Sequence, residues 1–176
     1  FEAFGAGFIR GAKDTSPAVR VLTVCYPNGP ARGFEDAQWG RQAAQQLISQ
    51  GADIIFAAAG VTGNAALEEI ASQPSAGVLG IGVDTDQYFT LPAAAPIMLS
   101  SAMKMVTPGV FNLIRDAHEG RFRGGNHLGG VILAPYHNQT QRVSPEARAK
   151  LQQIDDQVAA GTLDTGWAGP TGRCPS

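Results

Sequence analysis

Apolar residues in this chain follow two patterns that alternate along it. Short continuous apolar runs predict strands, and apolar residues at helical spacing predict helices. The runs lie at residues 19–25, 53–57, 78–83, 97–101 and 131–133. The helical segments lie at residues 1–14, 36–50, 65–72, 108–118 and 144–160. Strands that alternate with helices in this way predict βαβ units and a parallel sheet.

Several helix boundaries are marked by residues that favour helix ends. Gly51 follows the second helical segment as a stop signal, and Gly161 follows the last one. Pro108 falls in the first turn of its helix, and Ser144 before Pro145 forms an N-cap with proline at the first helical position. The predicted fold is therefore an α/β fold of three layers with a mostly parallel, doubly wound sheet.

The apolar run that begins at Gly77 ends abruptly in polar residues. Its last part is Gly80-Ile81-Gly82-Val83, and the next residues are Asp84-Thr85-Asp86-Gln87. A continuous apolar run is typical of a parallel strand buried on both faces, and such sheets bind ligands beyond the carboxyl ends of their strands. Asp84 is therefore expected where a polar ligand can be hydrogen-bonded.

Composition limits the size of the protein and the kinds of partner. The chain has 176 residues with 44% apolar content, enough for one ordinary domain with a core, and its net charge is only −2. Its 13 Lys and Arg residues are scattered, which argues against a nucleic-acid or membrane-surface partner. No run reaches the ~18 apolar residues of a spanning helix, and the first residues lack the pattern of a signal peptide. The chain is therefore expected to be a mature form or to lack its beginning.

The two cysteines, Cys25 and Cys174, leave two interpretations open. They can form one disulfide that ties the C-terminal tail to the first predicted strand, which would imply an oxidising compartment. Alternatively, Cys25 is a buried free thiol and Cys174 lies in a disordered tail. Neither cysteine has the spacing or the nearby histidines of a structural metal site, so no metal is expected.

Three further positions near predicted strand ends have both a functional and a structural interpretation. Phe34 can stack on a flat ligand, or it forms a hydrophobic staple beside an Asp36 N-cap. Gly60 lies in a strand-to-helix turn. The turn has neither a G-x-G-x-x-G pattern nor a Walker lysine, which disfavours a phosphate-binding loop. A tight turn that needs a positive φ is enough to explain the glycine. Lys104 can bring an ammonium group to the same sheet edge as Asp84, or it is a solvated lysine.

Motifs of known catalytic sites are missing from the sequence. The three histidines, His118, His127 and His137, are isolated from cysteines and from triad arrangements, and we expect them at the surface or in capping roles. The sequence has neither a Gly-x-Ser-x-Gly elbow nor a His-Glu-x-x-His helix. The chain is therefore expected to bind a ligand rather than to act as an enzyme, and to need no cofactor.

A set of short motifs is shared with a known family. The stretches are Gly7-Phe8-Ile9-Arg10-Gly11-Ala12, Gly33-Phe34-Glu35-Asp36, Gln50-Gly51-Ala52-Asp53-Ile54-Ile55, Ala59-Gly60-Val61-Thr62-Gly63, Gly80-Ile81-Gly82-Val83-Asp84-Thr85-Asp86-Gln87, Ser100-Ser101-Ala102-Met103-Lys104 and Leu133-Ala134-Pro135. In this order and spacing, over residues 5–165, the chain resembles the basic membrane protein (Bmp) family of bacterial solute-binding lipoproteins, which are purine-nucleoside receptors of ABC transporters.

The resemblance implies a type I periplasmic-binding-protein fold, in which two Rossmann-like lobes enclose a ligand. Carried over by motif, Phe34 would stack on the nucleobase, Gly60 would line the pocket, Asp84 would accept hydrogen bonds from ribose hydroxyls, and Lys104 would contact the ligand. It also implies a purine nucleoside as the ligand, an ABC permease as the partner of the full-length protein, and an extracytoplasmic location, either periplasmic or lipid-anchored at the cell surface.

The resemblance covers mainly the second lobe of such proteins. It implies that residues 1–87 form the first part of the ligand-binding lobe, residues 88–120 a crossover segment of the partner lobe, residues 121–165 the return, and residues 166–176 a tail. With most of the first lobe absent, Val110, Phe111 and Ile114 are expected to lack a partner and to favour association with another copy or with the missing lobe. The alternative function is a structural or interaction module that self-associates near residues 88–120 and binds no ligand.

Overall fold

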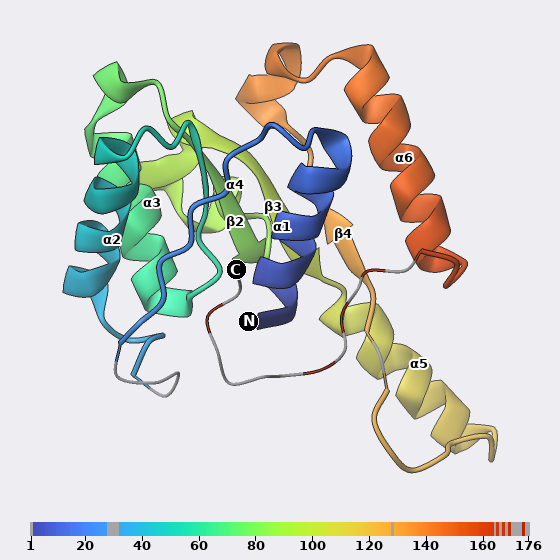
Figure 1. Ribbon diagram of the computed structural model, residues 1–176. Coiled ribbons are helices and arrows are strands. Elements are labelled where there is room, and N and C mark those ends of the chain that lie inside the picture. The colour runs from blue at the N-terminus through green and yellow to red at the C-terminus, as the bar shows by residue number, and fades with distance from the viewer. Residues whose placement is uncertain are drawn as a thin grey trace.

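A four-stranded sheet organises the computed structural model, which describes residues 2–27, 32–127 and 129–163 together with positions 165, 167, 169 and 174 (Figure 1). The strands are β1 (Ile54–Phe56), β2 (Leu79–Asp84), β3 (Met98–Lys104) and β4 (Val131–Leu133). They lie in the order β1-β2-β3-β4; the first three are parallel, and β4 is antiparallel to β3. The predicted α/β class with a mostly parallel sheet is therefore confirmed.

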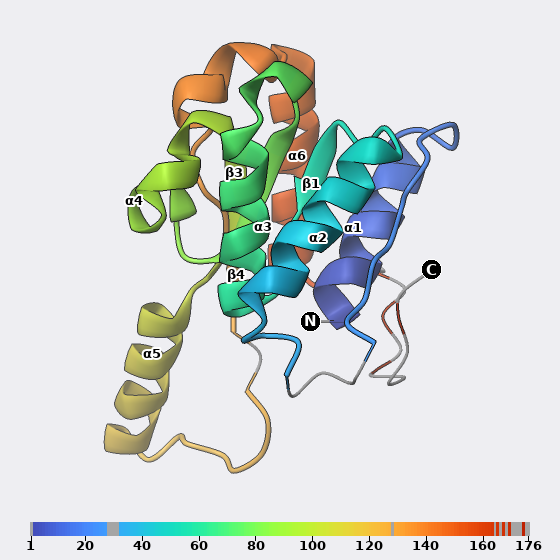
Figure 2. The same ribbon diagram turned by 90° about the vertical axis from the view of Figure 1, so that its left-hand side faces the viewer.

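Helices cover both faces of this sheet (Figure 2). The rings of Phe4 and Phe8 in one helix lie 6.1 and 5.5 Å from the ring of Phe56, whereas the next strand residue back, Ile55, belongs to the cluster that contains Leu67 of another. Successive strand residues point to opposite faces, so these two helices lie on opposite sides of the sheet. The α-helices are α1 (Glu2–Thr15), α2 (Ala37–Ser49), α3 (Gly60–Ser72), α4 (Gln87–Thr90), α5 (Val106–His118) and α6 (Pro145–Ala159), and the 3-10 turns are η1 (Pro74–Ala76), η2 (Pro92–Ile97) and η3 (His137–Arg142).

The core lies between α3 and the sheet. Leu67, Ile70 and Met98 are at most 1% exposed and pack in one cluster. Ala94 and Ile97 of η2 belong to the same cluster, so the segment that follows β2 completes the core of this lobe. Full burial of a Leu, Ile or Met side chain contributes about 1.5–3 kcal/mol. These few side chains therefore hold α3 and η2 against the sheet.

The helices predicted from the sequence all form, with shifted ends. Helix α3 begins at Gly60, ahead of the predicted residue 65, and β3 continues to Lys104, beyond the predicted residue 101. The extension of β3 follows from its neighbour, because Val131–Leu133 pairs with Ala102, Met103 and Lys104 and gives them a hydrogen-bonded partner. Pairing between segments distant in sequence is not visible in local patterns.

The predicted strand at residues 19–25 is wrong. No ladder joins this segment to the sheet, and none of its residues is in a strand. Side-chain hydrogen bonds hold this segment instead. Lys13 Nζ of α1 donates to Val19 O at 2.6 Å, and the Arg20 guanidinium donates to Gln50 O at the end of α2. Apolar and β-branched residues favour extended backbone, but a strand also needs a paired neighbour.

Helix α5 and the segment that returns from it project from the body as an arm (Figure 1). The base of the arm is closed by a hydrogen bond of 2.8 Å from Met105 N–H to Gly130 O. One set of its apolar side chains is at least half exposed: Val106, Val110, Phe111 and Ile114. The predicted lack of a partner for the last three of these agrees with their exposure.

The C-terminal part of the described chain contains α6 and one linked cysteine. Ser144 Oγ accepts a hydrogen bond from Ala147 N–H at 3.2 Å, as expected for the predicted N-cap. Cys174 is bonded to Cys25 in a disulfide that spans 149 positions of sequence. The rest of the predicted tail, residues 166–176, lies mostly outside the described residues. Among the described helices, none has both the length and the apolar content needed to cross a bilayer.

Candidate functional site

An ion pair lies at the carboxyl edge of the parallel strands. Asp84 ends β2 and Lys104 ends β3, and Lys104 Nζ lies 2.7 Å from Asp84 Oδ1. The side chains are 51% and 47% exposed, so both groups remain accessible to a ligand. The pair follows from register, because Asp84 lies opposite Met103 and the neighbouring residue is Lys104. The prediction that both residues lie at this edge agrees with the structure, and Lys104 is at once half exposed to solvent and paired with Asp84.

An aromatic side chain that the sequence analysis did not single out lies beside this ion pair. Lys104 Nζ is 5.4 Å from the centre of the Phe4 ring, within the range of a cation–π interaction. Phe4 in turn makes an edge-to-face contact with Phe56 at the end of β1. Helix α1 therefore contributes to the same edge as the strands. Nothing in the local pattern of α1 distinguishes Phe4 from Phe8, so only the fold could reveal this role.

Asp84 has an unusual backbone conformation. Its φ is +72°, and Thr85 N–H donates to Val83 O at 2.9 Å across it. A hydrogen bond from residue i+2 to residue i around a positive φ is typical of the classic γ-turn, which is rare and strained. Aspartate tolerates positive φ better than most residues, and strained residues of this kind concentrate at ligand sites. The strand thus ends in a sharp turn with a carboxylate at its centre.

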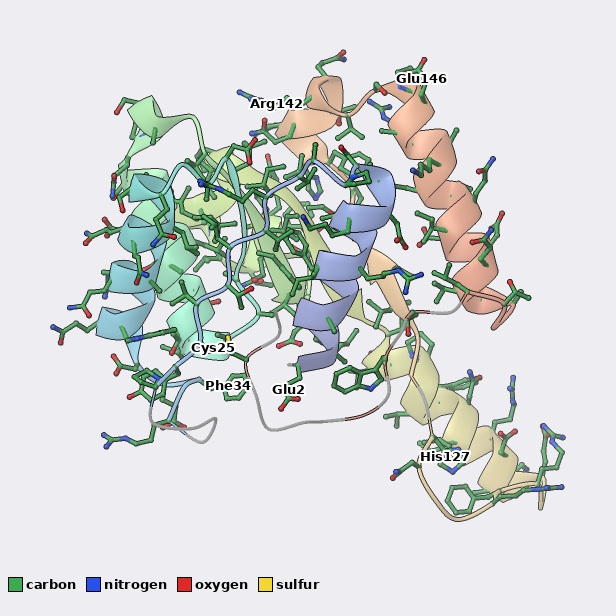
Figure 3. The ribbon with its side chains drawn as sticks, viewed as in Figure 1. Glu2, Cys25, Phe34, His127, Arg142 and Glu146 are labelled. Carbon is green, nitrogen blue, oxygen red and sulfur yellow. A yellow bond between two sulfur atoms is a disulfide. The ribbon has the colours of Figure 1, made fainter. Side chains whose placement is uncertain are left out.

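Phe34 and Gly60 meet at the start of α3. Gly60 has φ +54°, and a Cβ added there would lie 3.2 Å from Phe34 O and 3.4 Å from Phe34 Cδ1. The buried Thr62 holds the Phe34 segment against the start of α3: its N–H donates to Phe34 O at 3.3 Å and its Oγ1 accepts from Asp36 N–H at 2.9 Å. Phe34 remains 39% exposed and lies at the lower edge of the main body in Figure 3, near Cys25. The positive φ favours a glycine here, and the space beside its Cα is tight.

Asp36 is the N-cap of α2. Its Oδ1 accepts from Trp39 N–H at 2.9 Å, and its Oδ2 accepts from the Tyr26 hydroxyl at 3.1 Å. The hydrogen bond from Trp39, aided by Tyr26, holds the pKa of Asp36 below its ordinary value. The structural interpretation of Asp36 as a cap is therefore right. The Phe34 ring lies against Gly60, and its contact role stays a prediction.

The part of the chain that contains this edge matches a known protein family. The family model described as "ABC transporter substrate-binding protein PnrA-like", called Bmp, matches residues 1–130. The chain belongs to the Bmp family. The motif that ends in Asp84-Thr85-Asp86-Gln87, the start of α3 and the end of β3 all fall within the matched region.

Curated relatives of this Bmp chain are longer than the chain itself. The CD4+ T-cell-stimulating antigen of Listeria monocytogenes is 30% identical over 178 residues, and basic membrane protein D of Borreliella burgdorferi is 32% identical over 128 residues. These alignments cover 92% and 72% of this chain but only 48% and 35% of the two relatives. The chain thus spans about half the length of the first of these relatives.

Two solved structures share the fold of this Bmp chain. An ABC transporter solute-binding protein from Conexibacter woesei aligns with a TM-score of 0.66 at 21% identity, over 93% of this chain and 52% of that one. A transcriptional activator of the comK gene from Bacillus halodurans also aligns with a TM-score of 0.66, at 18% identity, over 100% of this chain and 66% of that one. Proteins with different described functions share the fold, so function must be argued from the site.

A second paired group in this Bmp chain lies beside the turn. His137 Nε2 is 2.8 Å from Asp86 Oδ2, and the two side chains are only 16% and 17% exposed. Asp86 also caps α4 by accepting from Tyr88 N–H at 3.2 Å, and the Tyr88 ring stacks on His137 with centroids 4.0 Å apart. The expectation that His137 lies at the surface or caps a helix is therefore wrong. Its partner lies 51 positions away in sequence, and local spacing gives no sign of it.

The described residues offer no metal site at this edge. Among them, no group of three or more His, Cys, Asp or Glu side chains is placed to hold a metal ion. What the edge does offer is a carboxylate, an ammonium group, an exposed aromatic ring and the amino end of α3. Such groups bind and orient a small polar ligand.

Proposed function

We propose that this chain supplies one wall of the ligand cleft of an ABC-type solute-binding protein, and that the ligand is a purine nucleoside. The observation that carries the proposal is the arrangement at the carboxyl edge, where the accessible Asp84–Lys104 pair lies at adjacent strand ends and Phe34 lies on Gly60. Membership of a substrate-binding family supports a binding role without turnover.

Each of the four residues has a role that fits its chemistry. Asp84 retains oxygen lone pairs beyond the one turned to Lys104, and a carboxylate can accept hydrogen bonds from both hydroxyls of a ribose diol. Lys104 donates to a ligand oxygen from the same pair. Phe34 presents an exposed ring on which a purine base can stack, and Gly60 lets Phe34 approach the start of α3 closely and so line the pocket there.

The other wall of the cleft belongs to a partner lobe in this proposal. Residues 1–87 with the return at 121–165 form the ligand-binding lobe, residues 88–120 cross toward the partner lobe, and residues 166–176 form a tail. The exposed apolar side chains of α5 support the later part of this crossing segment, since Phe111 and Ile114 are 63% and 64% exposed. The packing of η2 on α3 supports a crossing point nearer to Lys104 than to residue 88. An ABC permease would be the partner of the assembled receptor.

An extracytoplasmic location follows from the same proposal. The Cys25–Cys174 disulfide supports it, because disulfides persist mainly in oxidising compartments. The protein would then meet its ligand outside the cytoplasm, in the periplasm or anchored at the cell surface.

A thermal-shift and calorimetry panel tests the ligand class. Wild-type protein is titrated with purine nucleosides, pyrimidine nucleosides, free bases and pentoses, beside Asp84→Ala and, as a control, Asp155→Ala, an exposed aspartate on α6. A purine nucleoside at a hundredfold excess over Kd should add about 2.7 kcal/mol to the free energy of unfolding. The gain should persist in Asp155→Ala and be lost in Asp84→Ala. A wild-type protein that responds to no nucleoside contradicts the proposal.

One observation favours a second function, a self-associating interaction module. The apolar face of α5 is exposed on the arm, where a second copy of the chain could cover it. Sedimentation velocity of wild type and of the Phe111→Glu/Ile114→Glu variant separates the two functions. A dimer that the double substitution dissociates, together with no response to nucleosides, would favour the interaction module.

A further inference from the structure

Gln87 is a buried polar residue that the proposed roles above do not use. It is 6% exposed, it begins α4, and its main chain and side chain make three hydrogen bonds to three other elements or their ends. Its Oε1 accepts from Val83 N–H at 2.8 Å, its Nε2 donates to Asn64 Oδ1 at 2.7 Å, and its N–H donates to Ser101 Oγ at 3.1 Å. Both polar ends of its amide are therefore bonded inside the protein.

The bond to Val83 continues the sheet past the end of β1. Leu79 N–H donates to Asp53 O, and Ile81 O accepts from Ala57 N–H, so the odd-numbered residues of β2 direct their polar groups toward β1. Strand β1 ends at Phe56, so Val83 N–H meets no strand on that side. A buried N–H without a partner costs about 1–3 kcal/mol. The Gln87 amide oxygen supplies the missing acceptor.

This bond fixes the turn that carries Asp84. Val83 O accepts from Thr85 N–H and Val83 N–H donates to Gln87, so both polar groups of the residue before Asp84 are held. The side chain of residue 87 thereby closes a small ring around Asp84, Thr85 and Asp86. Within this ring Asp84 adopts its φ of +72° and meets Lys104.

The sequence around Gln87 leaves space for it. A Cβ added to Gly82 would lie 2.5 Å from Gln87 Oε1 and 2.7 Å from Ser101 Oγ. Any other residue at position 82 would therefore push the Gln87 amide oxygen away from Val83 N–H, which donates to it. Ser101 is 0% exposed and lies on β3, the strand that ends at Lys104. Gln87 thus bonds to both strands whose ends form the Asp84–Lys104 pair.

We infer that Gln87 is a positioning residue for ligand binding: it holds the Asp84 turn in its strained form and so orients the carboxylate that receives the ligand. The inference rests on the proposed function, in which Asp84 contacts the ligand. Gln87 itself is directed into the protein and acts only through Asp84.

The test uses Gln87→Met with a matched control elsewhere in the chain. Gln139 is also buried, at 8% exposure, and its Nε2 donates to Pro96 O at 2.7 Å, so Gln139→Met removes a comparable buried amide. Affinity for a purine nucleoside is measured by calorimetry, and amide hydrogen exchange at Thr85 is measured without ligand. We expect Gln87→Met to weaken binding and to speed Thr85 exchange by about tenfold each, as for loss of one hydrogen bond. Gln139→Met should change neither by more than about twofold.

Other results overturn the inference. It is wrong if Gln87→Met binds within about twofold of wild type, or if both variants weaken binding equally, since loss of stability would then explain the effect. If wild type binds no nucleoside, the proposed function fails, and Thr85 exchange alone decides whether Gln87 holds the turn. If Gln87→Met does not fold, Asn64→Leu, which removes only the acceptor of Gln87 Nε2, replaces it with the same expectations.

Discussion

Asp84 combines a backbone conformation that favours glycine with a side chain that only an acid can supply. Its φ of +72° is disfavoured for residues with a Cβ, and the 2.7 Å contact with Lys104 is half exposed and contributes little to stability. A residue kept at the expense of backbone strain is typical of a functional position. Replacing Asp84 by glycine should therefore relieve the backbone strain and, at the same time, remove the carboxylate that would contact a ligand.

We predict that Asp84→Gly is more stable than Asp84→Ala by about 1 kcal/mol, because glycine accepts the positive φ and alanine does not. Neither variant should bind the ligand. Urea denaturation of the two proteins measures the difference.

The matched control is Asp53, which has no positive φ. There the order should reverse, with Asp53→Ala more stable than Asp53→Gly, because glycine only adds freedom to the unfolded chain. The same order at both positions would contradict strain at Asp84.

At the scale of elements, α2 depends on a charged cap. The hydrogen bond from Trp39 N–H, with that from the Tyr26 hydroxyl, lowers the pKa of Asp36 from its ordinary value of 3.8. A lowered carboxyl pKa stabilises the folded state above the unfolded pKa, and this stabilisation is lost as pH falls through the folded pKa.

We predict that Asp36→Asn is less stable than wild type at neutral pH and that the gap narrows below about pH 4. The cause is that the asparagine cap keeps an acceptor oxygen but no charge. Denaturation curves of both proteins across that range give the difference. A gap that stays constant down to about pH 2 would contradict the role of the Asp36 charge.

Helices α3 and α5 differ sharply in how their aliphatic residues are used. Leu67 of α3 is 0% exposed, whereas Ile114 of α5 is 64% exposed. Leu67→Ala should therefore lower the free energy of unfolding by about 2–5 kcal/mol, and Ile114→Ala should change it by less than about 0.5 kcal/mol. Equal losses, measured by urea denaturation, would mean that α5 is packed against something in the isolated chain.

At the scale of the whole molecule, the disulfide joins the segment before α2 to the far end of the chain. A link across 149 positions restricts the unfolded chain over most of its length. Replacing both cysteines, as Cys25→Ser/Cys174→Ser, should lower stability by about 2–4 kcal/mol. Thiol titration of the denatured, unreduced wild type should find no free thiol. A full complement of free thiols would contradict the link.

Much of the architecture could be predicted from local patterns, because each element carries its own signals. Ser144 and Pro145 mark the start of α6, and the apolar run before Asp84 marks β2. Residues 19–25 have the composition of a strand but no neighbour to pair with, and composition alone cannot reveal that.

The candidate site could be predicted only in part for the same reason. Asp84 and Lys104 each follow an apolar run, so their strand ends were predictable. The contact of Lys104 with Phe4, and that of Asp86 with His137, depend on how distant segments pack. Gln87 is the last residue of the shared motif at residues 80–87, yet its hydrogen bond to Val83 N–H is needed only because β1 ends at Phe56.

The arm built on α5 has one more consequence, for how the chain tolerates change in length. Lys104 and Val131 lie directly opposite each other in the antiparallel β3–β4 pair, and Met105 N–H to Gly130 O closes the base of the arm just beyond them. The segment between Lys104 and Val131 therefore leaves the sheet and returns to it at the same place. A two-residue Asn-Gly turn in its place would join β3 to β4 as a plain hairpin. The edge that carries Asp84 and Lys104 is thus separable from the arm, and insertions or deletions in the arm need not alter it.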